Sequence, residues 1–136
     1  MTSLDADISV GSVRRPFSLA ARQRSFVYAG RGVWTMLASE HNAWIHATAT
    51  VAVVAAGLAF GVSRFEWLAL VFAIVAVWTA EAMNTAFESL CDVASPRFHP
   101  LVARAKDVAA GAVLICALGA LATAALVFAP YVTALF

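Results

Sequence analysis

The sequence has few charged residues for its length. Only 12% of its 136 residues are Asp, Glu, Lys or Arg, whereas 62% are hydrophobic, and the mean hydropathy is +0.84. A soluble domain of this size could not cover so much apolar surface, so the composition indicates an integral membrane protein of one domain. No sign of charge dominates either, since the formal net charge is +1, which argues against a nucleic-acid partner.

Cysteine, histidine and the common nucleotide-binding motifs are also scarce. Cys91 and Cys116 lie in apolar segments without a disulfide framework or a metal-ligand spacing, and the three histidines are too scattered for a zinc site. Met1–Arg15 lacks the apolar core of a signal peptide, so we expect residues 1–15 to form a flexible tail and residues 16–136 a membrane-embedded domain. Neither a Gly-x-x-x-x-Gly-Lys-Ser/Thr loop nor a protein-kinase signature is present, so any ATP site would have to be built differently.

Three long apolar runs follow an amphipathic segment. Pro16–Leu37 has apolar residues on one helical face and basic residues on the other, which predicts a helix lying on the membrane surface. Membrane spans are expected at Trp44–Val62, from about Phe65 to about Val93, and from about Leu101 into the uncharged end of the chain. The predicted fold is therefore all-α and integral to the membrane, with three transmembrane helices and an N-terminal amphipathic surface helix.

Polar residues mark the breaks between these helices. Ser39–Asn42 predicts a bend or a cap, in which Glu40, taken alone, is best explained as a solvated cap residue. Ser63–Glu66 predicts a tight turn, and Trp67 behind it suits an anchor at the membrane interface. The two prolines of Ser95–Pro100 predict a short rigid loop.

The basic residues are distributed unevenly along the chain. Five of the nine Lys and Arg residues precede Glu40, and three lie between Arg97 and Lys106. Because basic segments remain on the cytoplasmic side of a membrane, we expect the N-terminal arm and the 94–106 loop to face the cytoplasm. The 63–66 turn and the C-terminus then face outward.

A stripe of polar residues interrupts the second apolar run. At about 100° per residue on a helix, Glu81, Asn84, Glu88 and Asp92 fall within an arc of about 80°. An ionised acid in a membrane costs about 2.5 kcal/mol or more unless it faces protein, water or a metal, so the stripe indicates a site. The other explanation is the wet face of a helix that has left the membrane. The expected orientation gathers these four residues on the cytoplasmic side with Glu40, His99, Lys106 and Asp107.

Several carboxylates beside a lysine suit a magnesium-bound polyphosphate. Mg²⁺ usually takes one or two carboxylates together with phosphate oxygens, and phosphoryl transfer needs a group that accepts the proton of the attacking hydroxyl. Glu81, the deepest of these acids, is placed to serve as that base towards a lipid alcohol. The same acids would also serve as the relay of a small cation- or proton-coupled transporter, and their spacing alone does not separate the two functions.

The segment from Glu81 to Asp92, together with Phe98-His-Pro-Leu and Ala105-Lys-Asp, closely resembles the prokaryotic diacylglycerol kinase family, which includes the undecaprenol kinases. The resemblance covers about Ser25 to Phe128. It implies a homotrimer in the bacterial inner membrane, with active sites shared between neighbouring subunits. It also implies transfer of the γ-phosphate of ATP, with Mg²⁺, to the hydroxyl of diacylglycerol or undecaprenol. The loop around His99 looks more like the undecaprenol-using branch.

The resemblance also implies roles for single residues. By matching position, Glu81 looks like the general base and Asn84 like a neighbour that orients the reacting groups. Glu40 and Glu88 look like the magnesium ligands, which replaces the cap interpretation of Glu40, and Lys106 resembles the residue that holds the ATP phosphates. The other positions that match the nucleotide site are Tyr28, Gly32, Asp92, His99 and Asp107.

Two positions depart from the family pattern. Trp44 stands where arginine is common, and Phe98 stands where tyrosine is frequent. Phe98 can stack or pack as tyrosine does, but it has no hydroxyl to donate to a nucleotide. Trp44 is expected to change the contact of this segment with the lipid or with the membrane interface.

Overall fold

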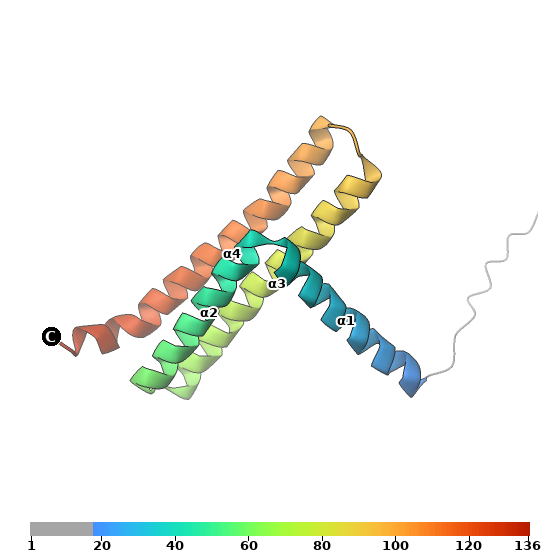
Figure 1. The fold of residues 1–136 in the computed structure, drawn as a ribbon. Coiled ribbons are helices and arrows are strands. Elements are labelled where there is room, and N and C mark those ends of the chain that lie inside the picture. Colours follow the sequence, from blue (N-terminus) through green and yellow to red (C-terminus); the bar gives the residue numbers. More distant parts are fainter. Residues whose placement is uncertain (1–17) are drawn as a thin grey trace, which may run out of the picture.

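The computed structural model describes residues 18–136, and every regular element in that range is a helix (Figure 1). The helices are α1 (Leu19–Ser39), α2 (His41–Phe60), α3 (Arg64–Ala94) and α4 (Pro100–Thr133). The all-α prediction is confirmed for this part of the chain. The expected tail, residues 1–15, and its boundary with the membrane domain lie outside the described residues.

Within the described range, three helices (α2, α3 and α4) are long and apolar enough to cross a membrane, as predicted. At 1.5 Å per residue, α2 is about 30 Å long, α3 about 46 Å and α4 about 51 Å, against about 30 Å for a hydrocarbon core. In Figure 1, α2 runs beside one half of the α3–α4 hairpin, and the other half continues alone to the loop after α3. The hairpin is therefore longer than a bilayer core, whereas α2 matches it.

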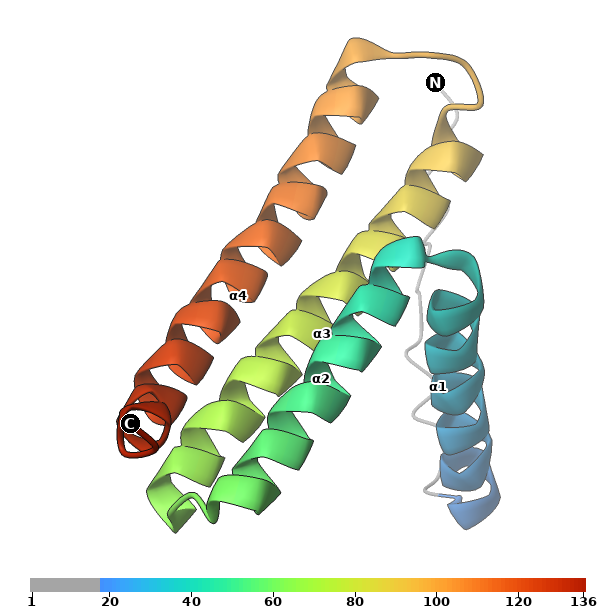
Figure 2. The same ribbon diagram turned by 60° about the vertical axis from the view of Figure 1, so that its left-hand side comes forward.

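Helix α1 meets the bundle through its last turn and then diverges from it. Met36 is its buried residue, whereas apolar side chains further from the junction are open, with Phe26 79% exposed. Glu40 separates α1 from α2 with extended backbone angles, φ −100° and ψ 119°. Figure 2 shows α1 on the side of α2 and α3 that faces away from α4. Away from the junction, the apolar face predicted for this segment is thus not covered by any of the residues that the structure describes.

The connection between α2 and α3 is shorter than predicted. Gly61 ends α2 in the left-handed conformation, with φ of 64°, and α3 begins at Arg64. The Ser63 side chain accepts from the Glu66 amide, and Glu66 Oε2 accepts from the Ser63 amide at 2.6 Å. This reciprocal capping box starts the helix, so the prediction of a turn over Ser63–Glu66 was wrong for its last three residues. Tyr131 donates a 2.8 Å hydrogen bond to the same Glu66 carboxylate and ties α4 to this end.

Tight packing is concentrated at this end of the bundle. The indole of Trp67, expected at the membrane interface, lies against Gly57, where an added Cβ would come within 2.7 Å of the ring. Val62, Leu70 and Val127 form the buried cluster beside it. Many large apolar side chains elsewhere on α2, α3 and α4 are exposed, as expected for helices that face lipid or other subunits.

Candidate functional site

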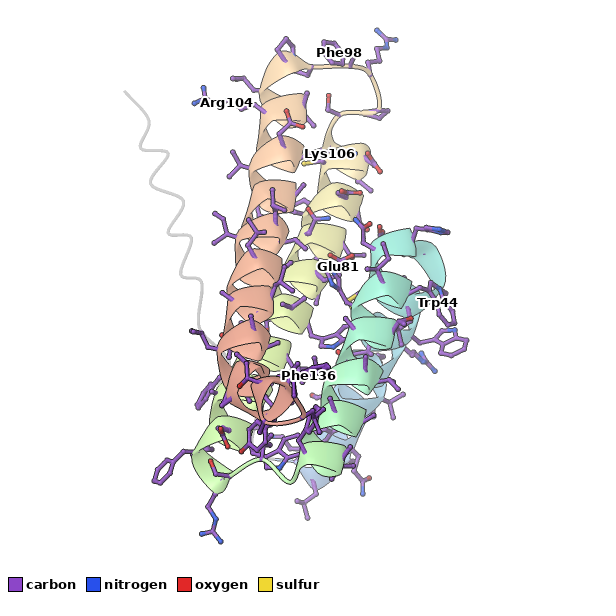
Figure 3. All side chains as sticks on the ribbon, turned by 90° about the vertical axis from the view of Figure 1, so that its left-hand side faces the viewer. Trp44, Glu81, Phe98, Arg104, Lys106 and Phe136 are labelled. Atoms are coloured by element: carbon purple, nitrogen blue, oxygen red, sulfur yellow. The ribbon has the colours of Figure 1, made fainter. Side chains whose placement is uncertain are left out.

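A cavity of about 260 Å³ lies between α2, α3 and α4 at the level where α2 begins. It brings together four of the predicted site residues, Glu40, Glu81, Asn84 and Glu88. Figure 3 shows Glu81 on α3 near the start of α2. The other lining residues are Asn42, Ile45, His46, Ala110, Val113, Leu114 and Ala117. The cavity is thus acidic at one wall and apolar at the other.

Glu81 is the most deeply buried acid of the described residues, with only 1% of its surface exposed. Neither of its carboxylate oxygens has a hydrogen-bond partner among residues 18–136, and His46 Nε2 lies 3.7 Å from Oε2. A buried polar group without partners is unfavourable for folding and is characteristic of functional sites. The geometry leaves the carboxylate of Glu81 free to accept a proton.

Asn84 lies one turn further along α3 and is only 6% exposed. Its Nδ2 donates a 3.1 Å hydrogen bond to Oε1 of Glu88, and its Oδ1 has no partner among the described residues. The i, i+4 spacing makes this contact possible because both side chains lie on the same helical face. Asn84 therefore orients the carboxylate of Glu88 at the cavity wall.

Glu40 occupies the position of an N-cap for α2, as the sequence predicted, but its side chain makes no capping hydrogen bond. The carboxylate accepts a 3.3 Å hydrogen bond from Ser39 and lines the cavity that contains Glu81. The interpretation of Glu40 as a cap is therefore correct for the backbone and wrong for the side chain.

The oxygen donors of this cavity fit a cation that arrives with phosphate. Among residues 18–136, no three His, Cys, Asp or Glu side chains are close enough to hold a metal ion by themselves. Glu40 and Glu88 nevertheless line one cavity, and the unpaired Oδ1 of Asn84 is a third oxygen. Mg²⁺ is usually bound by one or two carboxylates plus substrate phosphates, so this donor set suits magnesium better than an all-protein cage would.

A second set of polar residues lies at the loop between α3 and α4, where they line a pocket of about 250 Å³. Lys106 forms an ion pair with Asp92 there, and His99 Nδ1 accepts a 3.2 Å hydrogen bond from the Leu101 amide, capping α4. Phe98 lines the same pocket. Asp92 is eleven residues beyond Glu81, which is about 16 Å along α3. Polar residues thus extend from the buried carboxylate to the loop.

Three predicted residues lie in neither of these two cavities. Tyr28 is 62% exposed on α1 with its ring 6.0 Å from the Arg31 guanidinium, and a Cβ at Gly32 would meet nothing within 4 Å. Asp107 is exposed on α4. Their assignment to the nucleotide site stays a prediction.

His46 was missed as a site residue. The spacing of the histidines was considered for zinc, and His99 was assigned to the nucleotide site, whereas His46 contacts an acid on another helix. The available signal was its place inside an apolar span, where an ionisable side chain usually has a functional partner.

Comparison with known proteins places these residues in a family. The family model described as prokaryotic diacylglycerol kinase matches residues 27–128, a range that contains every predicted site residue. The chain is 38% identical over 107 residues to an undecaprenol kinase of Bacillus subtilis, covering 79% of this chain and 87% of that protein. It is 37% identical over 97 residues to a diacylglycerol kinase of Synechocystis sp., covering 71% of this chain and 55% of that protein.

Proposed function

Because this chain belongs to the prokaryotic diacylglycerol kinase family and is a lipid kinase of that type, we propose that it transfers the γ-phosphate of ATP to the hydroxyl of undecaprenol. Support for this alcohol comes from the alignment with the undecaprenol kinase, which covers 87% of that protein against 55% of the diacylglycerol kinase. Diacylglycerol is the second candidate, since the two identities are nearly equal. The transporter alternative has no support from the family match.

The observation that carries the proposal is the buried, unpaired carboxylate of Glu81 at the wall of an acidic cavity. In the proposed reaction, the lipid hydroxyl gives its proton to a carboxylate oxygen of Glu81. The hydroxyl oxygen forms a bond to the γ-phosphorus, and the bond from that phosphorus to the bridging oxygen of ADP breaks. The products are a lipid phosphate and ADP.

Glu40 and Glu88 are the proposed magnesium ligands, with Asn84 as the residue that orients Glu88 and the reacting groups. Their oxygens are the donors that Mg²⁺ prefers, and the hydrogen bond of Asn84 to Glu88 supports this assignment. When bound, the ion supplies charge neutralisation at the β- and γ-phosphate oxygens.

The pocket at the α3–α4 loop is the proposed nucleotide end of the site. Lys106 would exchange its ion pair with Asp92 for the ATP phosphates, because an ammonium group binds phosphate as a point charge. Phe98 lines the pocket as a surface for stacking. The remaining proposed nucleotide contacts are Asp92, His99, Asp107, Tyr28 and Gly32.

The proposed assembly is a homotrimer in the bacterial inner membrane, with active sites shared between neighbouring subunits. The many exposed apolar side chains support burial of the helices against lipid and other copies of the chain. The basic residues support a cytoplasmic N-terminus and active site, with the C-terminus outside. In this arrangement α1 lies on the inner membrane surface, where its exposed apolar residues meet lipid.

The test is phosphate transfer from labelled ATP with Mg²⁺ in mixed micelles, offering undecaprenol and diacylglycerol in separate reactions. The wild type is compared with Glu81→Gln and with Glu66→Gln, a matched control that changes the acid at the other end of α3. We expect label in undecaprenol, a loss of about 10²–10⁴-fold in Glu81→Gln, and full activity in the control. Label only in diacylglycerol would change the assigned alcohol, and near-normal turnover of Glu81→Gln would refute the assigned base.

A further inference from the structure

His46 is the basic side chain among the residues that line the acidic cavity. Its Nε2 lies 3.7 Å from Oε2 of Glu81, and the two side chains are only 13% and 1% exposed. His46 Nε2 and both oxygens of Glu81 lack hydrogen-bond partners among the described residues. Two buried polar groups that can satisfy each other thus face one another from α2 and α3.

The imidazole has an aromatic neighbour on α3, three residues before Glu81. The ring of Trp78 meets it edge to face, with centroids 6.4 Å apart and planes inclined at 70°. The indole N–H of Trp78 in turn donates a 3.1 Å hydrogen bond to Thr50, which lies one turn beyond His46 on α2. The Trp78–Thr50 bond fixes the indole between α2 and α3, and the indole limits how far the imidazole can turn away from Glu81.

We infer that His46 is a positioning residue for phosphoryl transfer, whose Nε2–H donates to the Glu81 carboxylate and holds it towards the lipid hydroxyl. The inference rests on the proposed role of Glu81 as the base. At 3.7 Å the contact is longer than an N–H···O hydrogen bond, in which the donor–acceptor distance is about 2.7–3.2 Å. Catalytic hydrogen bonds that are long in the free enzyme often shorten when substrate binds. Glu40 and Glu88 also face the cavity, so an unheld Glu81 would be repelled from its position by like charges.

The other role open to His46 is simple packing between α2 and α3. Leucine at this position keeps the bulk and removes the N–H, whereas glutamine places an amide N–H near the position of imidazole Nε2. A packing role predicts that leucine is the better replacement, and a positioning role predicts that glutamine is.

The experiment compares His46→Leu and His46→Gln in the full chain, in mixed micelles with the lipid that the wild type phosphorylates. We expect kcat to fall about 100-fold in His46→Leu, as for other losses of catalytic geometry, with KM for ATP little changed. His46→Gln should recover most of kcat. His41→Leu is the matched control, because His41 is exposed five residues earlier on the same helix, and its activity should equal that of the wild type.

A double-mutant cycle with Glu81→Asp then separates coupling from packing. The Glu81→Asp side chain is one methylene shorter, so its carboxylate lies further from His46. If His46 acts by holding the Glu81 carboxylate, His46→Leu should lower kcat little in the Glu81→Asp background. An equal fold-loss in both backgrounds, or equal activity of His46→Leu and His46→Gln, would overturn the inference. If His46→Leu does not fold, the contrast between His46→Gln and the shorter His46→Asn decides, with equal activity again refuting it.

The outcome for His46 is distinguishable from failure of the proposed function. Loss of activity in Glu81→Gln with full activity in His46→Leu would overturn only the positioning role. Near-normal activity in Glu81→Gln would remove the base assignment itself, whatever His46→Leu does.

Discussion

The side-chain amide of Asn84 donates a 3.1 Å hydrogen bond to Oε1 of Glu88, one turn further along α3. The bond engages one oxygen of the carboxylate and leaves the other available to the magnesium ion that we propose Glu88 binds. Residues that orient a metal ligand in this way are typical of metal sites, and their loss weakens metal binding without removing a ligand. In the proposed site, Asn84 therefore links the dependence on Mg²⁺ to an uncharged residue that orients a ligand.

Replacement of Asn84 by alanine should raise the Mg²⁺ concentration needed for half-maximal activity about 10–100-fold, because Glu88 is no longer held. The measurement is lipid phosphorylation across a magnesium titration, with chelation by EDTA as the zero point. Ser89→Ala, on the exposed face of the same turn, is the control and should leave the titration unchanged. An unaltered magnesium curve in Asn84→Ala would show that the hydrogen bond has no bearing on the metal.

Lys106→Met should raise KM for ATP about 10–100-fold, since a hydrogen bond to a charged group contributes about 1.5–3 kcal/mol. Lys106→Arg keeps the charge and should lose less. Arg104→Met is the matched control, because Figure 3 shows Arg104 pointing away from Lys106 on α4. Initial rates at varied ATP decide the matter, and equal KM values for the two methionine variants would remove Lys106 from the phosphate site.

Gly57→Ala should destabilise the protein by about 1–3 kcal/mol through overpacking, because the new Cβ would approach the Trp67 ring to 2.7 Å. At Gly119 an added Cβ meets nothing within 4 Å, so Gly119→Ala should change stability little. Thermal unfolding in micelles compares the two variants. A second change, Trp67→Phe, should partly restore the stability of Gly57→Ala, and no restoration would mean that another contact is responsible.

The membrane orientation predicts opposite labelling of two single-cysteine variants made after Cys91 and Cys116 are replaced by alanine. Arg64→Cys, at the first residue of α3, should react with a membrane-impermeant thiol reagent in intact cells. Arg97→Cys, in the loop after α3, should react only after the membrane is permeabilised. The reverse pattern would invert the proposed topology and place the active site outside.

The helices and the acidic stripe were predictable because each depends on residues near one another in the sequence. Hydropathy alone separates the three candidate spans, and the period of a helix places Glu81, Asn84 and Glu88 on one face, as found at the cavity wall. Asp92 shares that stripe, yet it pairs with Lys106 outside the cavity. The packing of α4 against α3 thus decides which residues of the stripe share the cavity. The spacing of residues within α3 carries no information about that packing.

The features that were missed depend on contacts between helices. His46 meets Glu81, and Trp67 meets Gly57, across distances in sequence that no local pattern spans. The start of α3 is a different case, because the Ser63-x-x-Glu66 capping box is a local signal in the sequence. Both residues were instead predicted to lie in a turn. The positions of Tyr28 and Gly32 relative to the site stay predictions.

The difference in length between α2 and the α3–α4 hairpin bears on how a lipid-soluble alcohol and water-soluble ATP reach the same site. Counted from Arg64, Glu81 lies about 26 Å along α3, near the far boundary of a hydrocarbon core of about 30 Å, whereas Asp92 lies about 42 Å along it. In the proposed reaction, a polyprenol therefore stays dissolved among lipid tails with only its alcohol group at the boundary, while the adenine and ribose of ATP stay hydrated. Under this proposal, neither molecule has to be extracted from its own solvent, and only a phosphoryl group passes from one phase to the other.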